Sequence, residues 1–146
     1  MSSWPNLTDL IVAADSTAPV GLLGAPLAAG SVTPGHCDRA PGLLRQTLRR
    51  IGRYDVETGH QLETGVADRG DVELSGLGIE QATAPIREAV AASAAAHALT
   101  LLVGGNNAVT RPAVLALAEG ESPEGLSLDE VGLITVDAHF GMRDTS

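Results

Sequence analysis

Two side chains near the end of the sequence have types and a spacing suited to metal binding. Asp137 and His139 directly follow residues 131–136, an apolar run with the length of a buried strand. In extended backbone, residues two apart point to the same side. A carboxylate and an imidazole on one side suit Mn²⁺, Zn²⁺ or Fe²⁺. The alternative for so short a motif is a solvated aspartate beside a structural histidine.

A second polar cluster follows another apolar run. Residues 99–103 have the length and composition of a strand, and the sequence Gly104-Gly105-Asn106-Asn107 ends that run abruptly. In open α/β sheets, ligands bind beyond the carboxyl ends of the strands. We therefore expect the two clusters to lie at the same edge of one sheet.

The elements that must position these clusters can be predicted from apolar periodicity, proline and glycine. We expect strands at 19–23, at 66–74 (running into a loop), at 99–103 and at 131–136. Between them we expect three helices: one from Asp38 and Pro41 to Gly52, one from Pro85 over 86–98, and one from Thr110 to Gly120. The remaining segments are expected to be a turn at 24–26, a loop at 27–37, a polar turn at 54–62 and a polar linker at 119–130. In the first helix, Leu44, Leu48 and Ile51 form an apolar stripe, and the arginines lie mostly on the other side.

The alternation of strands and helices predicts the fold class. Four strands joined by three helical crossovers indicate an α/β fold, a three-layer αβα doubly wound parallel sheet. We expect residues 1–146 to form a single, partial domain in which residues 1–17 are an irregular arm. No covering helix follows the last expected strand, so the sheet is expected to be unfinished or to need a partner.

Composition excludes several classes of protein. The chain has 9 arginines, no lysine and 18 acidic residues, which give a net charge of −9. Such a charge disfavours nucleic acids and anionic membranes as partners. The first ten residues lack the basic start of a signal peptide, and the apolar runs are too short to span a membrane. With one cysteine, no internal disulfide can form, and we expect a cytoplasmic protein.

The motifs and their order resemble those of the ureohydrolase family, which comprises arginase, agmatinase and formimidoylglutamase. The resemblance rests on five segments: Gly21-Leu22-Leu23-Gly24-Ala25-Pro26, the stretch from Pro34-Gly35 to Arg45, Asp68-Arg69-Gly70-Asp71, Gly104-Gly105-Asn106-Asn107-Ala108, and Asp137-Ala138-His139-Phe140-Gly141. The family patterns at the last two segments are G-G-D-H-S and D-A-H-x-D. The residues of the second and fourth segments look most like those of formimidoylglutamase-type members. The resemblance covers the N-terminal half of the family pattern.

The resemblance implies an arginase-like sheet, cut off after its fourth strand, and two Mn²⁺ ions that share a hydroxide. It implies that Asp137 is a bridging carboxylate and His139 an imidazole ligand. Asn107 and Gly141 stand where the family has a histidine and a carboxylate, so their role as ligands is doubtful. The pair of ligands in the family's later D-x-D segment is absent from the sequence. Two of the six ligands that the resemblance implies are therefore present.

Three functional hypotheses follow. The first is Mn²⁺-dependent hydrolysis of a C–N bond in a small linear amidine or guanidine, with formimidoylglutamate as the first candidate and agmatine, a guanidino acid or arginine as the others. The second is a non-catalytic fragment or pseudoenzyme that lacks most metal ligands. The third is a small-molecule binder on a flavodoxin-like sheet. The resemblance is also compatible with a homo-oligomer, because relatives assemble into trimers or hexamers.

Several other residues could do chemistry, but each has a simpler structural interpretation. Cys37 is expected to be a small core or loop residue, and His60 a solvated residue in a turn. His97 ends an alanine-rich helix, where a cation would interact favourably with the helix dipole. Asp68 and Asp71 could form an acid–base pair, although a loop fixed by an Asx turn is the expected arrangement.

Overall fold

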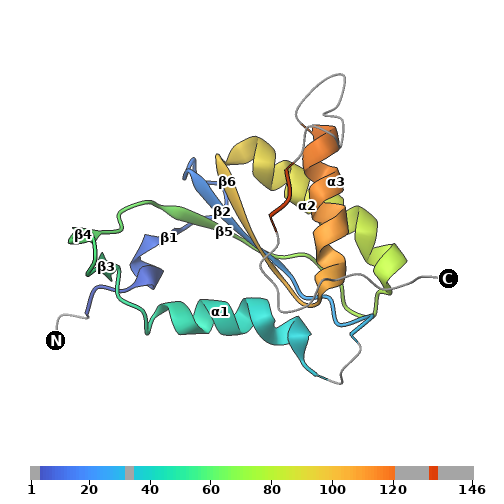
Figure 1. Cartoon of the computed structure of the whole chain (residues 1–146), viewed down its shortest axis with the longest axis horizontal. Helices are drawn as coiled ribbons and strands as arrows, with labels where there is room; N and C mark the ends of the chain where they lie inside the picture. Colours follow the sequence, from blue (N-terminus) through green and yellow to red (C-terminus); the bar gives the residue numbers. More distant parts are fainter. Residues whose placement is uncertain (1–3, 32–34, 121–131, 135–146) are drawn as a thin grey trace.

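A twisted sheet of four parallel strands forms the centre of the molecule. The computed structural model describes residues 4–31, 35–120 and 132–134. The strands are β1 (Ile11–Val12), β2 (Val20–Ala25), β5 (Val66–Asp71) and β6 (Leu99–Gly104), and their order in the sheet is β1-β5-β2-β6 (Figure 1). All three neighbouring pairs are parallel. Parallel neighbours require crossover connections, and helices supply them.

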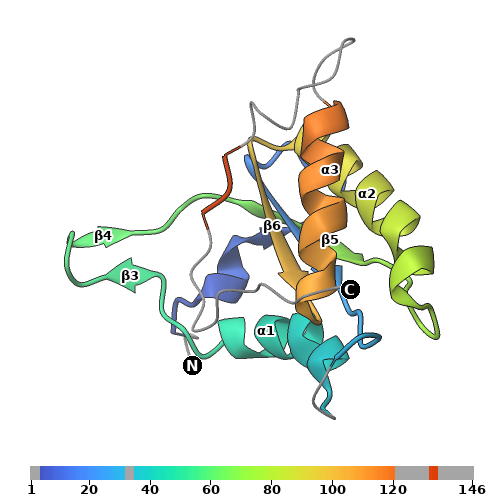
Figure 2. The same cartoon turned by 45° about the vertical axis from the view of Figure 1, so that its right-hand side comes forward.

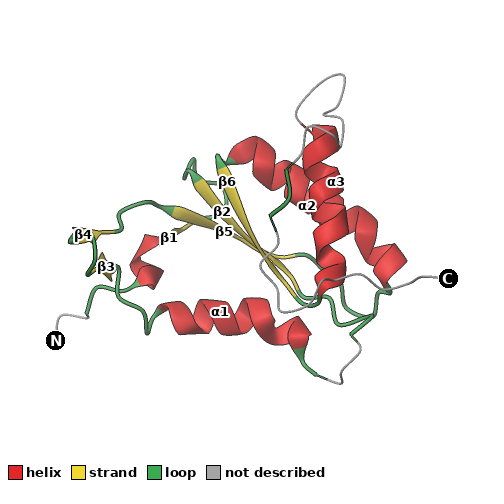
Figure 3. Ribbon diagram, viewed as in Figure 1, coloured by secondary structure: helices red, strands yellow, loops and turns green. Residues whose placement is uncertain are grey.

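Helices cover both faces of this sheet. Helix α1 (Ala40–Leu48) lies against one face, and α2 (Ile79–Ala96) and α3 (Thr110–Gly120) lie together on the other (Figure 3). Short 3₁₀ helices precede three of these elements: η1 (Leu7–Leu10) precedes β1, η2 (Cys37–Arg39) precedes α1, and η3 (Asn107–Val109) precedes α3. The three layers confirm the predicted αβα fold class.

The main core lies between the sheet and α2 with α3. Its strand residues are Leu23 and Ala25 of β2, and its helix residues include Ala82, Ile86 and Val90 of α2. The spacing of four between these helix residues places them on one face. Alanines at the other contact positions keep α2 close to the strands, so a chain with few aromatic residues still fills this side of the sheet.

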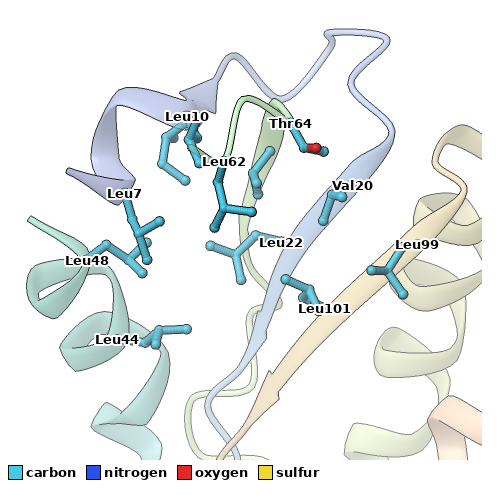
Figure 4. Close-up of a pocket in the computed structure, with 12 residues that line it drawn as sticks. Leu7, Leu10, Val20, Leu22, Leu44, Leu48, Leu62, Thr64, Leu99 and Leu101 are labelled. Carbon is cyan, nitrogen blue, oxygen red and sulfur yellow. The ribbon is translucent and has the colours of Figure 1, made fainter. Parts of the chain in front are cut away.

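The face toward α1 is filled less completely. A cavity of about 310 Å³ lies between α1, η1 and the sheet, and its lining is apolar. Figure 4 shows Leu44 and Leu48 of α1 facing Leu22 and Leu101 of the sheet across this space. Leu22 is 3% exposed, whereas Leu99 and Leu101 on the outer strand β6 are 53% and 45% exposed. Helix α1 contacts β6, but within the described residues it leaves these two leucines partly uncovered.

The second helix begins earlier than predicted. We expected it to start at Pro85, but α2 begins at Ile79 and contains Pro85. Gly78 precedes the helix in extended backbone, and its N–H donates to Gln81 Oε1 at 2.9 Å. Pro85 lacks the N–H that would donate to the Gln81 carbonyl, a loss that costs helix stability. Burial of Ala82 on the same stripe as Ile86 favours the longer helix.

The beginning of the chain also differs from the prediction. Within the expected irregular arm, η1 is followed by β1, which pairs with β5. Asn6 precedes and caps η1: its side chain accepts from the Thr8 N–H, and the Asp9 side chain accepts from the Asn6 N–H. This reciprocal capping motif was present in the sequence as a polar residue followed three positions later by a carboxylate.

The first helix and the expected turn at 54–62 need two smaller corrections. Asp38 does not cap α1, because it lies within η2 and the residue before the helix, Arg39, makes no side-chain cap. Residues 54–62 contain a small antiparallel hairpin, β3 (Tyr54–Asp55) and β4 (His60–Gln61), which projects away from the main sheet (Figure 2). Gly59 at its tip has a positive φ of 72°, which favours glycine.

The last predicted strand, at 131–136, lies mostly outside the described residues. Its described part, 132–134, has no regular secondary structure, and Leu133 and Ile134 are exposed.

In the described part of the chain, no helix is long and apolar enough to cross a membrane.

Candidate functional site

The carboxyl ends of three strands meet at one edge of the sheet. In the register of the ladders, Gly24 of β2 pairs with Asp71 of β5, and Ala25 pairs with Gly104 of β6. Neighbouring strands lie about 4.8 Å apart, so the ends of β5 and β6 are about 10 Å from each other. The polar cluster after β6 therefore lies at the edge where ligands bind in open α/β sheets, as predicted.

The loop after β6 is held to the chain that follows β2. Gly105 donates its N–H to the Ala25 carbonyl at 2.8 Å, and Asn106 donates to the Leu27 carbonyl at 3.1 Å. The Asn106 side chain donates to the Ala29 carbonyl and accepts from the Ala108 N–H at 2.8 Å. Asn106 therefore fixes the loop and caps the start of η3, and this use of its amide explains why an asparagine stands at that position.

Asn107 is the residue that this loop presents to solvent. It is exposed and begins η3, directly before α3. The other predicted site residues, Asp137, His139 and the doubtful Gly141, lie outside the described residues, so the structure does not test whether they approach Asn107. Asp137 and His139 remain predicted metal ligands.

The described residues by themselves do not fit a manganese site. Within residues 4–31, 35–120 and 132–134, no group of three or more histidine, cysteine, aspartate or glutamate side chains could hold a metal ion. Asn107 is the described residue at a position where the resemblance implies a ligand, and a neutral amide is a weaker ligand than a charged carboxylate or an imidazole. We therefore derive no chemical step through a metal from this part of the chain.

Asp68 and Asp71, at the end of β5, form an ion-pair cluster with Arg45 of α1. Arg45 binds Asp68 through two nitrogens, Nε at 2.7 Å and Nη2 at 2.8 Å, and its Nη1 lies 2.5 Å from Asp71 Oδ1. The Gly70 N–H donates to Asp68 Oδ1 at 3.0 Å, which is the expected Asx turn. With both carboxylates engaged by one guanidinium, this pair is a poor choice for acid–base catalysis.

The prediction that the arginines of this helix lie mostly on its outer side is wrong for Arg45, which faces β5. The signal that could have found it is Pro41, which is buried one helical turn earlier. Residues four apart share a helix face, so Arg45 also faces the sheet.

Acid should weaken this cluster in a defined pH range. The hydrogen bonds from Arg45 hold the pKa of Asp68 below its ordinary value, and they raise the pKa of Arg45. A lowered carboxyl pKa in the folded state stabilises the fold above the unfolded pKa of about 4, and this contribution is lost as the pH falls through the folded pKa. We expect Asp68→Asn to cost about 1–3 kcal/mol of unfolding free energy at pH 7 and clearly less at pH 3.

Urea unfolding of the unchanged protein and of Asp68→Asn, at pH 7 and at pH 3, measures how the cost of the substitution depends on pH. Asp15→Asn is a matched control, because it removes the same charge at an exposed position. A cost of Asp68→Asn that is equal at pH 7 and pH 3 would show that the charge of Asp68 does not stabilise the fold.

The structure shows the surroundings of three other residues that could do chemistry. Cys37 is half-buried, and its thiol lies 3.6 Å from the Leu27 carbonyl oxygen. His60 is exposed in the hairpin, as predicted. His97 is 6% exposed, and its Nδ1 lies 2.7 Å from the Ala18 carbonyl oxygen. His97 ends α2 as predicted, but it is buried there and connects the end of α2 to the start of β2, a contact that the helix-end position did not predict.

Comparison with known proteins places this arrangement in a family. The model of the arginase family matches residues 18–146. The chain is 27% identical to formimidoylglutamase of Bacillus subtilis over 145 residues, which are 96% of this chain and 43% of that protein. It is 30% identical to the mitochondrial guanidino acid hydrolase of Homo sapiens, over 88% of this chain and 36% of that protein.

Solved structures agree with the sequence comparison. Formimidoylglutamase from B. subtilis superposes with a TM-score of 0.72 and 22% identity, over 88% of this chain and 47% of that one. Formiminoglutamase of Trypanosoma cruzi, solved with Mn²⁺, superposes with a TM-score of 0.67 and 25% identity, over 77% of this chain and 39% of that one. The chain thus spans less than half the length of the relatives it matches. Because the family model covers most of the chain and the fold agrees, the chain belongs to the arginase family.

Proposed function

We propose that this chain contributes to the Mn²⁺-dependent hydrolysis of a C–N bond in a small linear amidine or guanidine. Water adds to the amidine or guanidine carbon, the C–N bond to the amine breaks, and formamide or urea is released with an amine or amino acid. Formimidoylglutamate is the first candidate substrate. The observation that carries this proposal is the Gly104–Asn107 loop, which presents Asn107 at the carboxyl edge of an arginase-family sheet.

Two further observations support this function. Asp137 and His139 occupy positions at which the family pattern D-A-H-x-D has metal ligands. The solved formiminoglutamase of T. cruzi contains Mn²⁺. The names of the matched relatives include a formimidoylglutamase, a guanidino acid hydrolase and an agmatinase, so agmatine, a guanidino acid and arginine stay among the candidate substrates.

A second candidate function is that of a half-domain without catalytic activity of its own. The cavity beneath α1 and the exposed Leu99 and Leu101 favour it, because parallel sheets are normally covered on both faces. Two protein side chains also leave most positions around Mn²⁺ to water. In this second proposal, another polypeptide segment must cover the β6 side of the sheet before a metal site is complete.

Product release from a panel of amidines separates the two functions. The 146-residue chain is incubated with saturating Mn²⁺ and with formimidoylglutamate, agmatine, guanidinoacetate or arginine, and formamide and urea are measured by NMR. Turnover that disappears on removal of Mn²⁺ and in Asp137→Ala would support catalysis by this chain and exclude the half-domain. Asp38→Ala is the control, because Asp38 lies in η2 and has no predicted role as a ligand.

Failure of this assay has a defined meaning as well. If the chain releases no product, mixing it with a polypeptide that carries the second half of an arginase-family protein tests the half-domain. Activity in the mixture would show that the chain supplies only part of the site. No activity in the mixture, and none in any longer natural form of the protein, would contradict the proposed hydrolase function.

A further inference from the structure

The guanidinium of Arg45 joins three groups at the carboxyl end of β5. Besides its two bonds to Asp68, its Nη2 donates to the Gly70 carbonyl oxygen at 3.0 Å, and its Nη1 lies 2.5 Å from Asp71 Oδ1. Gly70 has a positive φ of 76°, a conformation that favours glycine. Arg45 therefore bridges the two ends of a turn whose backbone conformation is unusual. The Arg45 side chain is 23% exposed and that of Asp68 24%, so water screens the Arg45–Asp68 pair only in part.

The turn that Arg45 holds is packed directly against β2. The Val72 N–H donates to the Gly24 carbonyl at 2.9 Å, and Gly24 pairs with Asp71 in the ladder. A Cβ atom placed on Gly24 would lie 2.8 Å from Asp71 Cγ and 2.8 Å from Pro41 Cβ. There is thus no room between α1, β5 and β2 at this point, and a shift of Asp71 would be transmitted to Gly24.

The end of β2 and the chain just after it carry the backbone acceptors of the Gly104–Asn107 loop. The Ala25 carbonyl, one residue after Gly24, accepts from the Gly105 N–H at 2.8 Å. The Leu27 carbonyl accepts from the Asn106 N–H at 3.1 Å. A continuous set of contacts therefore runs from Arg45 through the end of β2 to the loop that presents Asn107.

We propose that Arg45 is a positioning residue for the candidate site: by binding Asp68, Gly70 and Asp71 at once, it fixes the end of β2 and thereby the Gly104–Asn107 loop. A guanidinium suits this task, because its planar set of donors binds a carboxylate at two points and still reaches other acceptors. A lysine ammonium, a single charged point, cannot bridge all three groups in this geometry. The link between Arg45 and a catalytic site rests on the proposed function, whereas the contacts of Arg45 do not depend on it.

Native-state amide hydrogen exchange, measured by NMR on ¹⁵N-labelled protein without metal or substrate, tests this inference. The amides of Gly105 and Asn106 report on the loop, and the amide of Val90, buried in the middle of α2, reports on the rest of the fold. In Arg45→Met we expect exchange of the two loop amides to accelerate at least tenfold relative to that of Val90. Arg49→Met, at an exposed position just after α1, should leave this ratio unchanged.

The conservative variant separates geometry from charge. Arg45→Lys keeps the positive charge, and we expect it to recover part of the overall stability while the loop amides still exchange at least fivefold faster, relative to Val90, than in the unchanged protein. Loop amides that return fully to their original rate in Arg45→Lys would overturn the role of the guanidinium. Loop and Val90 amides that accelerate by the same factor in Arg45→Met would show that Arg45 only stabilises the fold.

A further variant covers the case in which Arg45→Met does not fold. Asp71→Asn removes one ionic partner of Arg45 and leaves the Arg45–Asp68 contacts in place. It should accelerate exchange at Gly105 and Asn106 more than at Val90, and equal acceleration would count against the proposal. Because no metal or substrate is present, these results stand whether or not the protein is a hydrolase.

Discussion

Gly105→Ala is expected to destabilise the protein by about 3 kcal/mol, at the upper end of the cost of overpacking a core. A Cβ atom at Gly105 would overlap the backbone of Leu27, at 2.7 Å from both its carbonyl carbon and its amide nitrogen. Side chains can rotate away from such a clash, but this backbone is fixed, because Leu27 is 1% exposed and belongs to the core. The loop and β2 would have to separate, with loss of the hydrogen bonds from Gly105 and Asn106.

Urea unfolding measures this cost, and Gly42→Ala is the matched control. Gly42 lies in α1, and a Cβ atom there would meet nothing within 4 Å. Alanine forms helices better than glycine, so Gly42→Ala should stabilise the fold by about 0.5–1 kcal/mol. If Gly105→Ala is also neutral or stabilising, the loop does not lie against Leu27 as described.

Strands β2, β5 and β6 and the loop after β6 could be predicted from the sequence for a simple reason, whereas β1 was missed. The runs 19–23 and 99–103 have the length of strands and end at glycines, and α1 and α3, which are separated by strands, each have a proline in the first turn. Right-handed crossovers then leave a parallel sheet as the expected result. Once the strands are parallel, their carboxyl ends must share one edge, which places Asn107 there without any knowledge of side-chain contacts.

The cluster around Arg45 could not be predicted in the same way. Local sequence shows that Asp68 and Gly70 can form an Asx turn, but the partner of Asp68 is 23 residues away on α1. The apolar stripe of a short helix indicates which side of the helix faces the sheet only if the stripe is well buried. In α1 only Pro41 is buried, while Ile51, assigned to the stripe, is 43% exposed just after the helix. The weak stripe explains the misplaced arginine.

His97 shows the same limit for a single residue at the end of a helix. The sequence places His97 directly after an alanine-rich helix, where the helix dipole is the nearest electrostatic feature. In the fold, its ring lies against β2, and a Cβ atom on Gly21 would be 2.6 Å from His97 Cδ2. The glycine in β2 and the histidine after α2 thus fit each other, although 76 positions in the sequence separate them. Tertiary packing, which no local pattern contains, decides the role of this imidazole.

The hydrogen bonds of His97 define which variants should fail. Nδ1 faces the Ala18 carbonyl at 2.7 Å, so it must carry the proton and donate. Nε2 lies 3.4 Å from Arg69 Nη1, and since a guanidinium only donates, Nε2 must accept. Removal of the ring would leave the Ala18 carbonyl without its donor, Arg69 without this acceptor, and a gap beside Gly21.

We therefore expect His97→Ala to cost about 2–4 kcal/mol of unfolding free energy, from the lost hydrogen bond and the cavity together. His97→Asn should cost less, because an amide at this position can still donate to the Ala18 carbonyl while leaving part of the gap. His60→Ala is the control, and it should change stability by less than about 0.5 kcal/mol, because His60 is exposed. Urea unfolding at pH 7 gives all three values. Equal costs for His97→Ala and His60→Ala would mean that the start of β2 and the end of α2 are not joined through this imidazole, and that the fit between Gly21 and His97 contributes nothing to the fold.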